Sequence, residues 1–274
     1  NNRFKTSTLI GYSMQLDAIG EHHPRPLIQR AFIHTGFGRK AERAAIHGYF
    51  RDGNSPTPYF VIEDSFWKFF KQKMLKLGQE HHDRQKESYD PLEGMLYSDG
   101  QFEELSQLSC ELFDIARHVW EEEVSAIRIM GYDQIYLEGN DSHYPVNDIV
   151  RKEGLDLVNL DQDNTYHDQL QERLHLGKDC IGGEGYTLQQ HREDLWVKEK
   201  IQKSNERCLL IAGEDHIDGT FGLDKRLEEE GIQLRTIRSF GNYSARISDI
   251  DMRMKCIMIE ASLNSREHHK KIYS

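Results

Sequence analysis

One continuous apolar stretch constrains the fold of this chain more than any other feature. It reads Cys-Leu-Leu-Ile-Ala over residues 208–212 and ends at Gly213. A run of this length and composition is typical of a strand buried in a parallel sheet. Helical apolar spacing occurs on either side of it, over residues 184–206 and 221–230, and residues 232–237 form another apolar strand. Strand, helix and strand at these lengths predict a βαβ unit.

Further apolar segments predict the rest of a sheet. Residues 6–19 are rich in β-branched side chains and predict an early strand, or two strands bent at Gly11. Residues 133–139 and 155–160 predict two short strands, and an apolar run within residues 252–263 predicts a last one.

A helical block separates the early strand from the others. Apolar and aromatic side chains recur at helical spacing over residues 66–77, and Gly78 predicts the end of that helix. The polar, turn-rich residues 79–100 predict a loop, in which His81 and His82 are solvated. Residues 102–127 predict a long amphipathic helix that a glycine stops.

Together these segments predict an α/β protein with a mixed central β-sheet flanked by helices. We find no repeat or linker that divides the sequence, so we expect one domain over residues 1–274. In this prediction residues 40–130 are a helical insertion after the first strands, which forms a lid or a subdomain.

Charge and hydropathy exclude several classes of protein. The chain carries 35 Lys and Arg against 46 Asp and Glu, a formal net charge of −11, and so lacks the positive surface of a nucleic-acid-binding protein. No window approaches about 18 consecutive apolar residues, so we expect no membrane span. The first residues carry no apolar signal-peptide run, and the four cysteines form no Cys-x-x-Cys pair. These features predict a cytoplasmic protein, or a secreted effector without a visible signal peptide, and leave its oligomeric state open.

Two predicted strands are followed by the same motif. Gly-Glu-x-His stands at residues 20–23 and again at residues 213–216, and Glu138 ends a third strand. The carboxyl ends of strands in α/β sheets form the crevice in which ligands bind, and glycine lets the chain turn sharply there. We therefore expect His23, Glu138 and His216 to converge in a metal-binding or acid–base site. The spacing favours His23 over the adjacent His22 as the residue that faces the site.

These residues resemble the Tiki/TraB group of proteins and its relatives, the erythromycin-esterase-like and ChaN-like proteins. Members carry one Gly-x-x-His motif after an early strand and a second near the C-terminal end, with a Glu and an Arg between them. In this sequence the motifs are residues 20–23 and 213–216, the glutamate is Glu138, and the arginine is Arg192 on the helix before the second motif.

The resemblance implies a hydrolase that acts on an ester or amide bond of a small molecule or a peptide. The Tiki branch implies a divalent ion (Mn, Co or Zn) on His23, Glu138 and His216, which activates a water molecule. The esterase-like branch implies no metal: a histidine acts as general base on water, and Arg192 stabilises the oxyanion.

The adjacent glutamates have two interpretations. Glu21 and Glu214 either orient the histidines, by accepting a hydrogen bond from the other ring nitrogen, or cap the helices that follow. No Gly-x-Ser-x-Gly motif occurs in the sequence, so a serine nucleophile is not predicted.

Other functions remain alternatives. The ChaN-like branch implies haem or small-ligand binding, with a neutral histidine or a tyrosine such as Tyr136 as axial ligand. An effector or toxin domain on the same scaffold is the third alternative.

Overall fold

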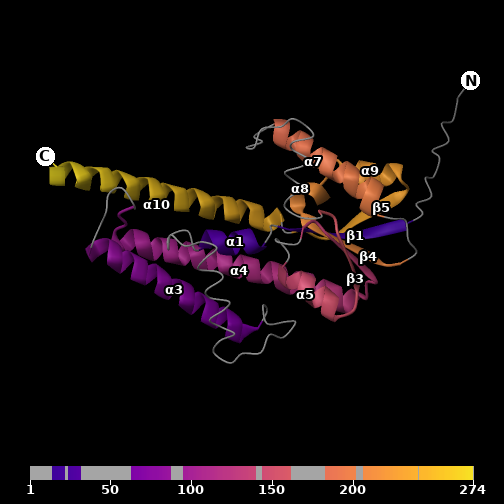
Figure 1. Cartoon of the computed structure of the whole chain (residues 1–274), viewed down its shortest axis with the longest axis horizontal. Coiled ribbons are helices and arrows are strands. Elements are labelled where there is room, and N and C mark those ends of the chain that lie inside the picture. The colour runs from indigo at the N-terminus through magenta and orange to yellow at the C-terminus, as the bar shows by residue number, and fades with distance from the viewer. Residues whose placement is uncertain are drawn as a thin grey trace, which may run out of the picture. The chain divides into compact units, whose positions relative to one another are not determined.

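The chain divides into two compact units, which are described separately. Unit 1 comprises Asn1–Glu21, Ser125–Asn140 and Val150–Ser239, and unit 2 comprises His22–Val124, Asp141–Ile149 and Phe240–Ser274. The computed structural model (Figure 1) describes residues 14–21, 24–31, 63–87, 95–139, 144–161, 183–201, 206–239 and 241–273. The predicted insertion, residues 40–130, contributes most of its length to unit 2.

Unit 1 is built on a five-stranded sheet with the order β3-β2-β4-β1-β5. All described strand pairings are parallel, so the α/β class is confirmed and the described sheet is parallel rather than mixed. The strands are β1 (Met14–Glu21), β2 (Gln134–Leu137), β3 (Asp156–Asn159), β4 (Cys208–Gly213) and β5 (Ile232–Ser239).

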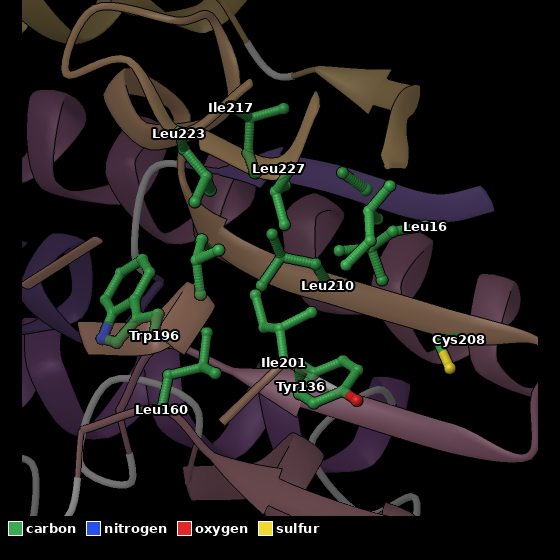
Figure 2. Packing of buried hydrophobic residues seen from close by; sticks show 14 of the residues in the cluster. Leu16, Tyr136, Leu160, Trp196, Ile201, Cys208, Leu210, Ile217, Leu223 and Leu227 are labelled. Atoms are coloured by element: carbon green, nitrogen blue, oxygen red, sulfur yellow. The ribbon is translucent and has the colours of Figure 1, made fainter. Parts of the chain in front are cut away.

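Unit 1 also contains helices, which lie in or beside the segments where the sequence predicts helical apolar spacing. They are α7 (Gly183–Leu195), the π-helical turn η3 (Trp196–Lys200), α8 (Glu214–Ile217) and α9 (Leu223–Glu229). Apolar side chains of η3, α8 and α9 pack with those of the strands in one cluster, in which Trp196 and Leu210 are fully buried (Figure 2). The alternate side chains of β4, such as Leu209, are also fully buried. Burial of both faces explains why β4 is apolar throughout.

Gly20 lets the start of α8 lie against the end of β1. A Cβ atom at Gly20 would approach the Cα of Glu214 and the Cβ of Ile217 to 3.3 Å each. Such contacts are tighter than ordinary van der Waals packing, so a side chain here would push α8 away. In the described residues this glycine therefore serves packing at the strand edge.

Unit 2 contains the long helices. These are α1 (Pro24–Ala31), α3 (Asp64–Glu87), most of α4 (Asp99–Met130) and α10 (Gly241–Tyr273), and α5 (Tyr144–Lys152) crosses the boundary between the units. The predicted helix over residues 102–127 is confirmed, and it ends at Gly131, whose φ is +62°. The glycine adopts the left-handed conformation that helix ends favour.

Three local predictions in unit 2 are wrong. Gly78 lies inside α3, and residues 79–87 continue that helix instead of starting a loop. His82 is buried, with its Nε2 atom 2.9 Å from Asp99 Oδ1 and its ring stacked on Phe102. These tertiary contacts outweigh the modest helix-breaking tendency of one glycine. Residues 252–263, predicted as a strand, belong to α10, because short apolar runs fit helix and strand periods alike.

Asp17 is a buried carboxylate whose ion pair makes the stability of unit 1 depend on pH. It accepts hydrogen bonds from Arg235 Nε and Nη2, both at 2.7 Å, and from Tyr132 Oη at 2.9 Å. Burial alone would raise the pKa of Asp17, but these hydrogen bonds outweigh it and lower the pKa below its ordinary value. A carboxyl whose pKa is lowered on folding contributes stability above its unfolded pKa and loses it as the pH falls.

We expect Asp17→Asn to lower the free energy of unfolding at pH 7 by about 1–3 kcal/mol, the range for hydrogen bonds to charged groups. The difference from the unaltered protein should shrink below about pH 4, where the unfolded carboxyl becomes protonated. Urea unfolding followed by circular dichroism at pH 7 and pH 3 measures both effects. A difference that is the same at both pH values would show that the ionised form of Asp17 is unimportant.

Candidate functional site

Polar residues gather where β2, β3 and β4 end. Glu138 directly follows β2, Asp161 follows β3 by two residues, and His216 lies on α8 directly after β4. The backbone N–H of Gly213 donates to Glu138 Oε2 at 2.7 Å. Because these strands are parallel neighbours, their carboxyl ends meet at one edge of the sheet. The register therefore brings together residues that are far apart in the sequence.

Arg192 on α7 joins two of these strand ends. Its Nη2 atom donates to Glu138 Oε1 at 3.0 Å and also to Asp161 Oδ2, and its Nη1 atom donates to Gln189. Its guanidinium carbon lies 5.1 Å from the centre of the Trp196 ring, a cation–π distance. Burial alone would lower the pKa of Arg192, but the charges of Glu138 and Asp161 outweigh it and raise the pKa. Arg192 is thus a permanent cation held between two carboxylates.

Each ring nitrogen of His216 faces a carboxylate. Its Nδ1 atom is 2.8 Å from Glu193 Oε1, and its Nε2 atom is 3.5 Å from Glu138 Oε1. The imidazole also packs against the rings of Trp196 and Phe221, at centroid distances of 4.7 and 5.1 Å. Burial alone would lower the pKa of His216, but the hydrogen bonds of Glu138 and Glu193 outweigh it and raise the pKa. Both ring nitrogens therefore face acceptors.

Glu193 is the most deeply buried member of this group, with a fully buried side chain. Its Oε2 atom accepts a hydrogen bond from Arg226 Nη1 at 3.2 Å, and Arg226 also donates from Nε to Asp194. Burial raises the pKa of Glu193, against the lowering effects of His216 and Arg226. The pKa values of Glu193 and His216 are therefore both raised above their ordinary values, by different causes.

We call this group of residues the strand-edge cluster. Acidic and basic side chains alternate along it, and each contacts the next. Its members, in order of contact, are Asp161, Arg192, Glu138, His216, Glu193 and Arg226.

The cluster contains some of the residues predicted from the sequence. Glu138, Arg192 and His216 were predicted to share a site, and the structure brings them into contact. Glu21 is buried at the end of β1, directly beside Gly213 in the sheet. The acceptor at His216 Nδ1 is Glu193 and not Glu214, which lies in the first turn of α8. His22 and His23 lie outside the described residues, so the predicted pairing of His23 with His216 stays a prediction.

Three members of the strand-edge cluster are not among the residues predicted from the sequence: Asp161, Glu193 and Arg226. Asp161 follows a predicted strand, as Glu138 does, so the same strand-end rule would have found it. Glu193 and Arg226 lie on helices, and no motif distinguishes them from surface residues. Their ion pair forms only because α7 packs against α9.

The metal ion that the resemblance implies stays a prediction, because His23 lies outside the described residues. Among the described residues, no group of three or more His, Cys, Asp or Glu side chains is arranged to hold a metal ion. Glu138 Oε1 already contacts a guanidinium cation, which repels a second cation at the same atom. Tyr136, the tyrosine considered as a haem ligand, lies in the apolar core and donates to Gln134 Oε1 at 2.6 Å.

Comparisons with known proteins add no family to these observations. No protein-family model, no curated protein and no solved structure matches the chain. The resemblance to the Tiki/TraB superfamily therefore stays a prediction. Within the described residues, no helix combines the length and apolar character that a membrane crossing requires.

Proposed function

We propose that the protein hydrolyses an ester or amide bond of a small molecule or peptide at the strand-edge cluster. His216 is the general base in this proposal. The observation that carries it is the environment of the imidazole, whose Nδ1 atom is bound by the buried Glu193 while its Nε2 atom faces Glu138 across 3.5 Å. With Nδ1 held by Glu193, the neutral imidazole can exchange a proton at Nε2, the nitrogen that Glu138 also faces.

The chemical step follows from this orientation. Neutral His216 accepts a proton from water at Nε2 while the water oxygen bonds to the carbonyl carbon of the substrate. The tetrahedral intermediate then collapses, its bond to the leaving oxygen or nitrogen breaks, and His216 returns the proton to that atom. Glu193 acts as a positioning residue, because it fixes the ring and stabilises the imidazolium that forms.

Arg192 supplies a donor for the developing oxyanion. Its two terminal nitrogens are engaged by Glu138, Asp161 and Gln189. Its Nε–H is buried and has no hydrogen-bond partner among the described residues. A buried donor without an acceptor is costly, and a substrate oxyanion would satisfy it. This geometry supports the metal-free, esterase-like mechanism.

A substrate screen tests the proposed function. Purified protein is assayed against p-nitrophenyl esters of increasing acyl length and against a fluorogenic peptide-amide library, each beside His216→Gln. We expect turnover of at least one class by the unaltered protein and its loss in the variant. Equal rates in the two proteins would assign the hydrolysis to a contaminant and contradict the role of His216.

The metal requirement has its own test. We expect elemental analysis of the purified protein to find no stoichiometric divalent ion and expect chelator dialysis to leave the activity unchanged, because Arg192 holds Glu138. His216→Ala is analysed in parallel. A stoichiometric Mn, Co or Zn ion that disappears in His216→Ala would replace this mechanism with the metal-dependent one. Bound iron with a haem absorption band would contradict both hydrolytic mechanisms.

A further inference from the structure

Helix α10 carries apolar side chains on two opposite faces. One face is buried and includes Ile250, Met254, Ile257 and Ala261. This face packs within unit 2, where Arg253 Nη2 donates to Glu104 on α4 at 2.8 Å. On the helical wheel of about 100° per residue, a second set of apolar residues lies on the opposite side. We call this set the outer stripe: Met252, Cys256, Ile259 and Leu263.

The outer stripe is exposed and regularly spaced. Met252, Ile259 and Leu263 are 59, 61 and 54% exposed, and Cys256 is exposed as well. Their intervals of four, three and four residues are those of the seam of a coiled coil. No described element of the chain buries these side chains. Large apolar side chains in a continuous stripe are costly to leave in water and are typical of an association surface.

The charged residues at the two ends of the outer stripe indicate which partner it binds. Continuing the same spacing, the next residue before Met252 is Asp249 and the next after Leu263 is Arg266, and both are exposed. The stripe thus begins with an acid and ends with a base. In a parallel pair of such helices each charge would lie beside its own copy and repel it. In an antiparallel pair Asp249 would lie beside Arg266 of the second helix at both ends.

We propose that the outer stripe is a dimer interface, at which α10 packs antiparallel against α10 of a second copy of this chain. A two-fold axis then places Met252 beside Leu263 of the other copy and Cys256 beside Ile259. A self-complementary patch of this kind is the requirement of a two-fold interface.

Sedimentation equilibrium of the full chain between about 1 and 200 µM tests the proposal. We expect a reversible monomer–dimer equilibrium for the unaltered protein. Asp249→Arg and Arg266→Glu should each weaken the dimer about 10-fold or more, because each removes two attractive pairs and creates two repulsive ones. The double variant Asp249→Arg/Arg266→Glu should recover most of the affinity, since it restores opposite charges only in the antiparallel arrangement.

Two further variants make the result decisive. Ile259→Asp should abolish dimer formation without unfolding the protein, because Ile259 is exposed in the single chain. Lys198→Glu, a charge reversal at an exposed position of η3, is the matched control and should leave the equilibrium unchanged. A monomer at all concentrations would overturn the proposal and assign the stripe to another partner. A dimer that survives Ile259→Asp, or single variants that the double variant does not rescue, would overturn it too.

Discussion

If the proposed hydrolysis takes place at His216, we expect His216→Gln to lower kcat/KM for the substrate by about 10²–10⁴-fold, the usual contribution of a general acid–base residue. Glutamine retains a hydrogen-bond donor for Glu193 but has no group that titrates near neutral pH. His191→Gln is the matched control, because His191 is exposed on α7 and lies outside the strand-edge cluster. We expect the control to retain full activity, and comparable losses in both variants would remove His216 from the mechanism.

The pH dependence distinguishes catalysis by His216 from a structural role. Only the neutral imidazole accepts a proton, so the rate should rise with pH through the pKa of His216. The hydrogen bonds of Glu138 and Glu193 place this pKa above the ordinary value for histidine, against the effect of burial. Glu193→Gln removes one of these carboxylates and should move the midpoint to lower pH as well as reduce kcat. A reduced kcat with an unchanged midpoint would make Glu193 structural only.

Removing the charge of Arg192 has the largest effect that we expect on stability. Arg192→Met leaves Glu138 and Asp161 without their shared cation, and both side chains are largely buried, with 11 and 14% of their surface exposed. Breaking a buried ion pair by removing one partner costs about 3–5 kcal/mol, mostly from the charge left behind. We therefore expect a decrease of this size in the free energy of unfolding, measured by urea titration with circular dichroism.

Two variants identify the cause of that loss. Lys198→Met removes an exposed charge from the next helical segment and should change the stability by less than about 0.5 kcal/mol. Asp161→Asn introduced with Arg192→Met removes one of the uncompensated charges and should recover part of the stability. If the double variant is less stable than Arg192→Met, then the loss comes from packing of the guanidinium on Trp196 and not from unpaired charge.

Local sequence patterns determined much of unit 1. The apolar runs identified β2, β3 and β4. The run is clearest for β4, because a strand buried on both faces needs apolar side chains in succession. The helical periods identified α4 and α9 within a few residues at each end. The patterns failed where two structures share one pattern, as at residues 252–263, which belong to the 33-residue helix α10. In this segment apolar residues of the exposed face stand between those of the buried face, so the sequence reads as a continuous apolar run like that of a strand.

The candidate site was likewise predictable only in part. Glu138 and His216 were predictable because residues after parallel strands must emerge at the carboxyl edge of the sheet, whatever the rest of the chain does. The partners that shape their chemistry were not. Glu193 is next to Arg192 on α7, and only tertiary packing places Glu193 against His216 and Arg192 against Glu138. Sequence therefore determined which residues reach the edge of the sheet. Tertiary structure decided which charges meet there, because burial and distance depend on elements that are far apart in the chain.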